Sequence, residues 1–155
     1  MTISGTQIKH YAQPTRDFLS LVVLLDTEFT ARNGEIQETY DGLNKLEGIS
    51  DFFIAYHDDI PVGIAALKPY EKGTYEVKRV FVEKKYRGQG ISKLLMKKLE
   101  EKATEYHGYF LILETSATFM EARNLYRTLG YRITENYGPY VGMDMSVCMR
   151  KEIGS

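Results

Sequence analysis

The sequence has a single cysteine, Cys148, among its 155 residues. An intramolecular disulfide is therefore excluded, and a cysteine-rich zinc site is not expected. Long apolar runs are also missing, since no stretch approaches the roughly 20 residues that a membrane-spanning helix needs. The N-terminus lacks the charged start and apolar core of a secretory signal. These absences predict a cytoplasmic protein that has no membrane partner and needs no metal.

The chain is nevertheless long enough to bury a substantial core. A domain of this size buries roughly 68–70% of the surface that its unfolded chain exposes. Hydrophobic residues make up 43% of the sequence and charged residues 26%, as is ordinary for a globular protein. No linker, repeat or low-complexity tract divides the sequence, so we expect one domain spanning residues 1–155.

The net charge of −1 hides an uneven distribution of charge along the chain. Residues 78–102 include nine basic and three acidic residues, or +6, which leaves 11 basic and 18 acidic residues, or −7, elsewhere. A solvated helix face rich in lysine would give the same count. A local anion site is the sharper interpretation, because the basic residues surround Gly88 and Gly90. A nucleic-acid partner is not expected, since the acidic remainder would repel it.

The apolar pattern predicts a mixed α/β fold with a strand, a glycine loop, a helix and a second strand at its centre. The expected strands are 7–11, 53–57, 61–70, 74–83, 109–115, 131–137 and 145–153, and the expected helices are 14–32, 36–46, 91–103 and 122–129. The run 109–115 is apolar almost throughout, which is typical of a central strand buried on both faces. Gly130 is placed to end the last helix as its C′ residue.

The glycine pair in YRGQGISKLL, residues 86–95, raises the question of what approaches the backbone there. A P-loop would need Lys-Ser or Lys-Thr after the second glycine, but Ile91 follows. A dinucleotide-binding loop would need a third glycine where Lys93 stands. Both familiar phosphate loops are therefore excluded by spacing, and an isolated glycine pair can also be a simple turn.

Two blocks around this loop resemble the GCN5-related N-acetyltransferase (GNAT) superfamily. KRVFVEKKYRGQGISKLLMKKLEEKA, residues 78–103, resembles its acyl-CoA-binding core, and ARNLYRTLGYRI, residues 122–133, resembles its second signature. With the flanking strands, the resemblance covers residues 51–152. Ser92 stands where the family has a small apolar residue, and Phe119 where it often has asparagine. The resemblance implies a single-domain fold with a mixed central sheet flanked by helices on both faces, and an acyl-CoA-binding core at about 75–134.

The same resemblance implies acetyl-CoA as the co-substrate. The residues that it assigns to the CoA pyrophosphate are Arg87, Gly88, Gln89, Gly90, Ile91 and Ser92, and those that it assigns to the pantetheine arm, through the backbone, are Val80, Phe81 and Val82. Elementary physics agrees with the loop assignment, because glycine permits positive φ and leaves room for a phosphate. The backbone N–H groups at the start of the following helix would then converge on the phosphate oxygens.

Two residues are candidates for the chemistry. Tyr126 matches the family tyrosine near the thioester sulfur, and its reference pKa of about 10, against about 8.5 for a thiol, suits a proton donor to the leaving thiolate. The alternative is that it is one of twelve tyrosines and simply packs. Glu76 lies where family members often place the carboxylate that deprotonates the amine. The alternative for it is a glutamate on the strand surface, paired with Lys78. Cys148 is expected to be a buried apolar residue.

The acceptor is the least determined part of the sequence-based interpretation. The loop 136–142 supplies Tyr137 and Tyr140 as candidate contacts, and the alternative for it is an ordinary aromatic hairpin loop. The resemblance implies that the first two helices shape the acceptor pocket, which makes Glu28, Tyr40 and Asn44 further candidate contacts. We expect an N-acetyltransferase that acts by direct attack of a primary amine, from a small molecule or a protein, in a ternary complex. The alternative is a non-catalytic acyl-CoA-binding or regulatory domain, which would tolerate loss of Tyr126 and Glu76. The sequence leaves open whether the chain forms a homodimer.

Overall fold

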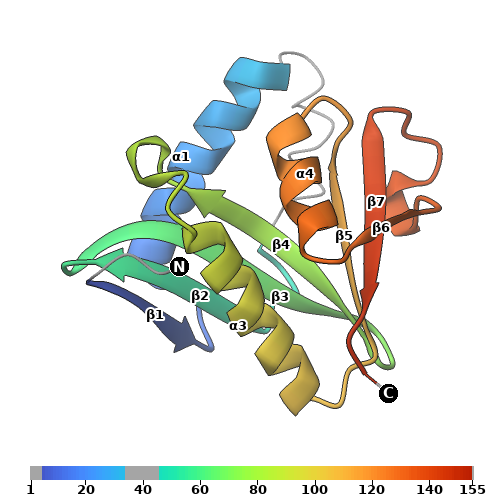
Figure 1. Ribbon diagram of the computed structural model, residues 1–155, viewed down its shortest axis with the longest axis horizontal. Coiled ribbons are helices and arrows are strands. Elements are labelled where there is room, and N and C mark those ends of the chain that lie inside the picture. Colours follow the sequence, from blue (N-terminus) through green and yellow to red (C-terminus); the bar gives the residue numbers. More distant parts are fainter. Residues whose placement is uncertain (1–4, 34–45, 155) are drawn as a thin grey trace.

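The structure, a computed structural model, describes residues 5–33 and 46–154 (Figure 1). The helix expected at 36–46 and the candidate contacts Tyr40 and Asn44 lie outside the described residues, apart from Leu46 at its end. The strands are β1 (Thr6–Tyr11), β2 (Asp51–His57), β3 (Ile60–Glu71), β4 (Thr74–Val82), β5 (Phe110–Ser116), β6 (Arg132–Thr134) and β7 (Ser146–Glu152). The α-helices are α1 (Arg16–Asn33), α3 (Ile91–Glu105) and α4 (Met120–Thr128), and two short 3-10 helices cover Lys84–Tyr86 and Gly138–Tyr140.

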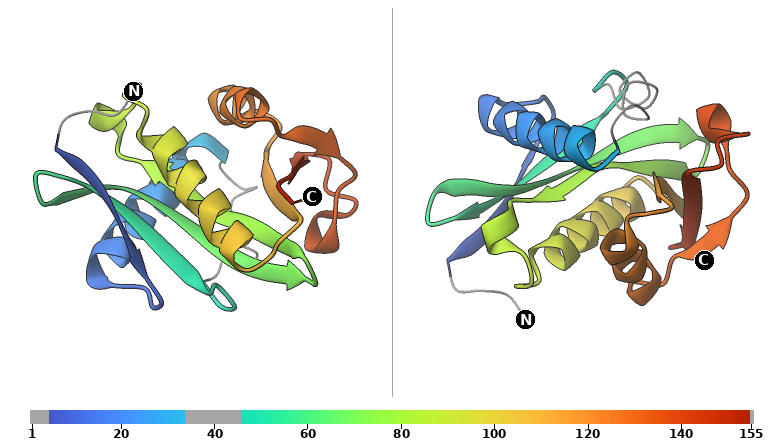
Figure 2. Two further views of the ribbon diagram at one scale, coloured as in Figure 1. Left: turned by 60° about the horizontal axis from the view of Figure 1, so that its bottom comes forward. Right: turned by 90° about the horizontal axis from the view of Figure 1, so that it is seen from above.

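The strands form one seven-stranded sheet in the order β1-β2-β3-β4-β5-β7-β6. Helix α1 covers one face of this sheet, and α3 and α4 cover the other (Figure 2). The expected mixed sheet with helices on both faces is thus confirmed. Within the described residues, no helix is long and apolar enough to cross a membrane.

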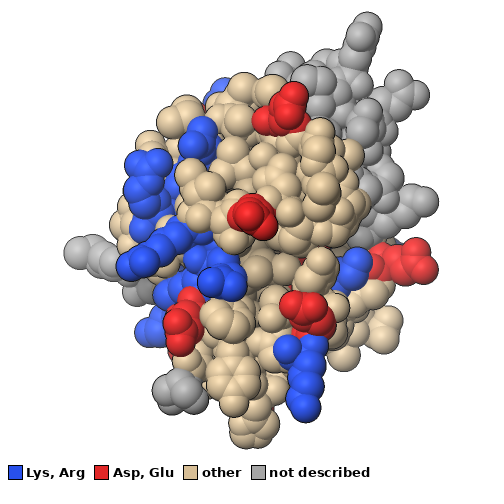
Figure 3. Space-filling model, turned by 90° about the vertical axis from the view of Figure 1, so that its right-hand side faces the viewer, with Lys and Arg blue, Asp and Glu red and all other residues tan. Residues whose placement is uncertain are grey.

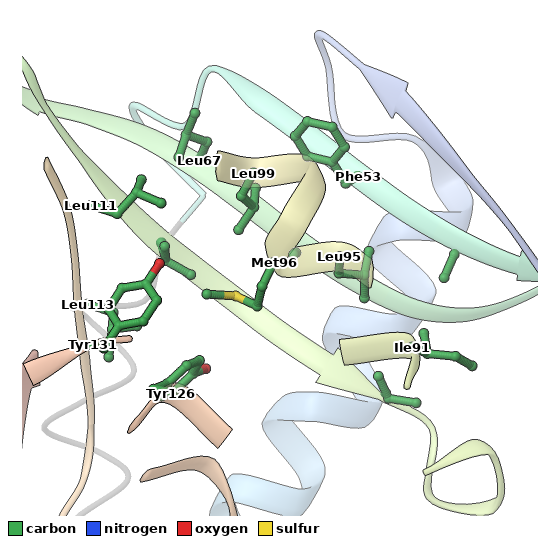
Figure 4. Close-up of a cluster of buried hydrophobic side chains, with 14 of the residues drawn as sticks. Phe53, Leu67, Ile91, Leu95, Met96, Leu99, Leu111, Leu113, Tyr126 and Tyr131 are labelled. Carbon is green, nitrogen blue, oxygen red and sulfur yellow. The ribbon is translucent and has the colours of Figure 1, made fainter. Parts of the chain in front are cut away.

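Each face has its own apolar cluster. On the α1 side, the Thr15 hydroxyl accepts a hydrogen bond from the Phe18 N–H at 3.2 Å and caps the helix, which buries Phe18 and Leu21. On the other side, residues of α3 spaced by three or four positions point at β2 and β3 (Figure 4). Helix α3 lies directly on β3, because a Cβ added at Gly63 would come within 3.2 Å of Ile91 and Leu95.

The close contact between α3 and β3 gives a direct test of the core. Leu95 is fully buried, so we expect Leu95→Ala to lower the free energy of unfolding by about 2–5 kcal/mol, through lost apolar contact and the cavity that remains. The matched control is Lys97→Ala, on the exposed side of the same helix, with a change within about 0.5 kcal/mol. Urea unfolding measures both, and equal effects of the two changes would contradict this packing.

The sheet splits between β4 and β5. These two strands run parallel and pair only from Thr74 to Glu76, opposite Phe110 to Ile112. The connection through α3 is the crossover that parallel neighbours require. Beyond Glu76 the two strands diverge (Figure 1), so along the rest of β4 the backbone edge on the β5 side has no strand partner.

A bulge in β4 lies just beyond the start of this split. Ile64 pairs with Phe81 and Ala66 with Lys78, so one residue of β3 faces two residues of β4, Arg79 and Val80. Arg79 has a left-handed φ of 56°, which is uncommon for a residue with a side chain. Its guanidinium contacts the Asp26 carboxylate of α1 at 2.6 Å. The bulge therefore presents two successive cations, Lys78 and Arg79, on the face that α1 covers.

The C-terminal third departs from the expected strand at 131–137. Strand β6 covers only Arg132–Thr134, because the loop that follows folds on itself. The Asn136 side-chain amide donates to three carbonyls, those of Tyr140, Met143 and Ser146, at 3.1, 3.1 and 3.3 Å. Gly130 follows α4 with φ of 99°, so its expected role as the C′ residue is confirmed.

Candidate active site

A cavity of about 900 Å³ lies in the split between β4 and β5. Its walls come from both strands, from the C-terminal half of α1, from the glycine loop with the start of α3, and from α4. A cavity of this size matches those that hold small-molecule ligands and cofactors, about 300–1,000 Å³. The split thus creates one chamber that is lined by helices from both faces of the sheet.

The glycine loop forms one end of the chamber. Gly88 and Gly90 both have positive φ, 79° and 85°. A Cβ added at Gly88 would meet no atom within 4 Å, so the space in front of the loop is open. Gly90 is the N-cap of α3, and the first N–H groups of a helix have no intrahelical acceptor. The loop and helix start therefore offer N–H donors to an anion in the chamber.

Eight of the nine residues expected to hold the co-substrate line the chamber, namely Val80, Phe81, Val82, Arg87, Gly88, Gly90, Ile91 and Ser92. Gln89 does not line it. The three residues of β4 lie beyond the last pair with β5, so their backbone edge faces the chamber, where an extended ligand can bind as a strand would.

Arg87 makes its contacts within the protein. Its Nε donates to the Val82 carbonyl at 2.7 Å, and its Nη2 donates to Glu28 Oε1 at 2.8 Å. Glu28 was expected to contact the acceptor, and it lines the chamber from α1. In this structure the pair joins α1 to the glycine loop.

Tyr126 points from α4 into the chamber. Its side chain is 8% exposed and packs edge-to-face on Tyr131, with ring centroids 5.9 Å apart. Burial raises the pKa of Tyr126, and the negative charge of Glu114 raises it further. The hydroxyl is therefore protonated throughout the neutral range and is a hydrogen-bond donor.

Glu76 is buried, so its interpretation as a glutamate on the strand surface is wrong. It is 5% exposed and lines the chamber. Its Oε2 accepts a hydrogen bond from the Tyr137 hydroxyl at 2.7 Å and lies 3.9 Å from Lys78 Nζ, which confirms the expected pair with Lys78. Tyr137 reaches Glu76 without lining the chamber. Tyr140 lines it, and its hydroxyl accepts a hydrogen bond from Lys78 at 3.1 Å.

Glu114 is a chamber residue that the sequence analysis missed. It lies on β5, and its Oε2 accepts a hydrogen bond from the Ser146 hydroxyl at 2.7 Å. Burial raises the pKa of this carboxyl, although Ser146 and Lys78 oppose the shift. The available signal was a single carboxylate inside the apolar run 109–115, where a purely structural strand has no need of one.

Cys148 agrees with its expected structural role. It is fully buried in β7 and does not line the chamber. Burial raises the pKa of its thiol to about 11, so it is protonated at neutral pH and weakly nucleophilic.

Charge is unevenly spread over the surface as well as along the sequence. On the face shown in Figure 3, basic side chains gather mainly along one edge, and acidic side chains stand singly. Three exposed lysines, Lys93, Lys97 and Lys98, follow the glycine loop on α3. Of these, Lys93 lines the chamber and places positive charge near the end that offers N–H donors.

Comparison with known proteins agrees with this geometry. Residues 48–133 match the family model of the acetyltransferase (GNAT) domain. The chain is 36% identical over 104 residues to human N-acetylaspartate synthetase, covering 65% of this chain and 34% of that protein. It therefore spans about a third of the length of the synthetases that it matches.

A second relative is similar over most of its length. The N-acetyltransferase YsnE of Bacillus subtilis, itself uncharacterized, is 33% identical over 116 residues, which cover 72% of this chain and 76% of that one. A GNAT family acetyltransferase from Elizabethkingia anophelis, solved with acetyl-CoA bound, shares the fold at a TM-score of 0.71 and 20% identity, over 97% of this chain and 99% of that one. The chain belongs to the GNAT family of acetyltransferases.

Proposed function

We propose that this chain transfers an acetyl group from acetyl-CoA to a primary amine, by direct attack in a ternary complex. One observation carries the proposal: the split between β4 and β5 brings the glycine loop, Tyr126 and the carboxylates of Glu76 and Glu114 into a single chamber. The alternative, a non-catalytic acyl-CoA-binding domain, needs the loop but has no use for the carboxylates or the tyrosine hydroxyl.

The co-substrate would lie between β4 and α4. The glycine loop and the first turn of α3 would hold the pyrophosphate, and the free edge of β4 at residues 80–82 would hydrogen-bond the pantetheine amides. This arrangement brings the thioester beyond the bulge at Arg79, on the side of Tyr126. A backbone N–H near Val80 or Val82 would then stabilise the oxyanion.

The acceptor would enter from the face that α1 covers. Val77 packs in the cluster under α3, so Glu76 and Lys78 point to the opposite face. Glu114 points the same way, because Leu113 packs in that same cluster. The co-substrate and the acceptor thus approach the split from opposite sides, as direct attack requires.

Glu114 is the better candidate for the proton acceptor. Glu76 and Glu114 both line the chamber from the two strands, but Glu76 is held by the Tyr137 hydroxyl and faces Lys78. Glu114 accepts one hydrogen bond through Oε2, and no described residue bonds its other oxygen. Burial raises the pKa of Glu114, and a base with a higher pKa takes a proton from an ammonium group more readily. Tyr126 would protonate the departing thiolate.

The proposed binding mode can be tested with two glycines. Gly88 and Gly142 have similar φ, 79° and 84°, and an added Cβ meets nothing within 4 Å at either, but only Gly88 lines the chamber. CoA at one hundred times its dissociation constant is expected to stabilise the fold by about 2.7 kcal/mol. Gly88→Val should abolish most of this gain and Gly142→Val should keep it, as thermal unfolding with and without CoA will measure. Equal gains in both variants would place the CoA site elsewhere.

The activity itself is tested by thiol release from acetyl-CoA across a panel of amines. The panel should include aspartate, because relatives are named for N-acetylaspartate, and cationic amines, because two carboxylates face the acceptor side. Acceptor-dependent thiol release supports the proposal. CoA binding without release on any amine would favour the non-catalytic alternative.

A further inference from the structure

Lys78 brings an amine of the protein itself into the acceptor side of the chamber. Its side chain is only 6% exposed, and it lines the same cavity as Tyr126 and Glu114. Its Nζ donates to the Tyr140 hydroxyl at 3.1 Å and lies 3.9 Å from Glu76 Oε2. Buried lysines are rare unless they are paired, and the proposed transfer mechanism does not use this one.

The surroundings of Lys78 favour its nucleophilic form. Burial lowers the pKa of its ammonium group, although the charges of Glu76 and Glu114 partly oppose the shift. A lowered pKa increases the neutral fraction, which is the form of an amine that attacks a thioester. Glu76 Oε2 lies 3.9 Å from Nζ, so it would receive the proton that the ammonium loses through one bridging water.

The position of Lys78 along β4 supplies the reach. It lies two residues before Val80, so at most about 7 Å of chain, the length of two extended residues, separates it from the backbone edge proposed to hold the pantetheine arm. The bulge at Arg79 intervenes, and the Lys78 side chain stays on the face that α1 covers. An external amine would approach the thioester from this same face.

We propose that Lys78 is itself an acetyl acceptor, so that the chain modifies its own Nζ when acetyl-CoA is bound and no external amine occupies the site. This inference rests on the proposed acetyltransferase function. The Nζ lone pair forms a C–N bond with the acetyl carbonyl carbon, and the C–S bond of the thioester breaks. The amine loses one proton and the CoA thiolate gains one, so the products are an amide at Lys78 and free CoA thiol.

Such a modification, made while no acceptor is bound, would lower the rate at which the chain later acetylates an external amine. The amide carries no charge, so Glu76 and Glu114 would lose a neighbouring cation. The acetyl group would also occupy space on the acceptor side of the chamber. Preincubation with acetyl-CoA alone is therefore expected to slow later turnover of an external amine, whereas preincubation with CoA is not.

The experiment uses the full chain, acetyl-CoA alone, intact-mass measurement over time and peptide mapping. We expect the mass of one acetyl group to be added at Lys78, ahead of the exposed Lys97 and Lys98. Lys78→Arg keeps the charge and should lose this addition. Gly88→Val should prevent it, and Tyr126→Phe should slow it by about 10²–10⁴-fold, because thiolate departure is shared with the main reaction.

Acetylation confined to surface lysines would overturn the inference, as would acetylation of Lys78 at equal rates in the parent, Gly88→Val and Tyr126→Phe. The parent chain alone decides the matter if Lys78→Arg does not fold. Acetyl-CoA binding and turnover of an external amine, with Lys78 unmodified, would defeat this inference and leave the proposed function standing. Absence of acetyl-CoA binding would defeat both.

Discussion

Tyr126→Phe is expected to lower kcat by about 10²–10⁴-fold, the usual contribution of a positioned general acid. The change removes one hydroxyl and keeps the ring, so the contact with Tyr131 survives. The dissociation constant of acetyl-CoA should change little, because the loop and β4 would hold it. Burial and the charge of Glu114 raise the pKa of Tyr126 far above neutral, so its titration does not shape the pH profile of the parent. The profile of kcat in the variant should therefore have the same high-pH limb as the parent, at lower values throughout.

Tyr131→Phe is the matched control for this prediction. Tyr131 is 3% exposed in the same cluster and its pKa is also raised by burial, but it does not line the chamber. Steady-state kinetics and thermal unfolding of both variants distinguish a catalytic role of Tyr126 from a packing role. If both variants lose activity equally, or if the loss in Tyr126→Phe follows its melting temperature, Tyr126 is a packing residue.

Glu114→Gln is the second change with a large expected effect, a fall in kcat/KM of about 10²–10⁴-fold near neutral pH. A base must be ionised, so activity falls as pH drops through the pKa of the carboxyl. Burial raises that pKa, so the low-pH limb of the parent lies above the range of an ordinary carboxyl and disappears in the variant. Ser146→Ala removes a hydrogen bond that lowers the pKa, and should therefore move this limb to higher pH.

Glu76→Gln is the comparison that assigns the base. The substitution keeps the size of the side chain that accepts a hydrogen bond from the Tyr137 hydroxyl. The low-pH limb of the rate profile should persist in this variant. Loss of that limb in Glu76→Gln, with Glu114→Gln unaffected, would return the role to Glu76.

Stability gives an independent readout for Glu114. Its pKa is higher in the folded protein than in the unfolded chain, so stability is lost as pH rises from the unfolded value through the folded one. Glu114→Gln removes this loss, and the urea midpoint should vary less with pH across that window.

Local sequence signals predicted what lies close together along the chain. The glycine loop, the helix after it and Gly130 as the end of α4 depend on a few successive residues and on backbone conformations that glycine favours. The apolar run of β5 likewise predicted a central strand. The placement of Tyr126 came from the resemblance, since no spacing rule separates it from the other tyrosines.

The sequence could not predict contacts that the tertiary fold creates. Glu114 and Ser146 are 32 residues apart, and their contact depends on how β5 pairs with β7. Glu76 is buried because the loop after β6 brings Tyr137 over it. The pair of Arg87 with Glu28 spans 59 residues, and a loop rich in basic residues gave no indication that one of them would contact α1.

The short ladder between β4 and β5 has a mechanical consequence. These strands are paired at only three positions, from Thr74 to Glu76. The sheet therefore consists of two parts, β1 to β4 and β5 with β7 and β6, that meet along this short ladder. Helix α1 bridges the opening, since Phe29 stacks on Phe119 with ring centroids 5.1 Å apart. In the proposed binding mode, an extended ligand in the chamber would supply hydrogen bonds to β4 where β5 does not pair with it. The co-substrate would thus act as an additional strand that is present only when it is bound. The two parts of the sheet would be held in their most rigid alignment only while the co-substrate is in the chamber.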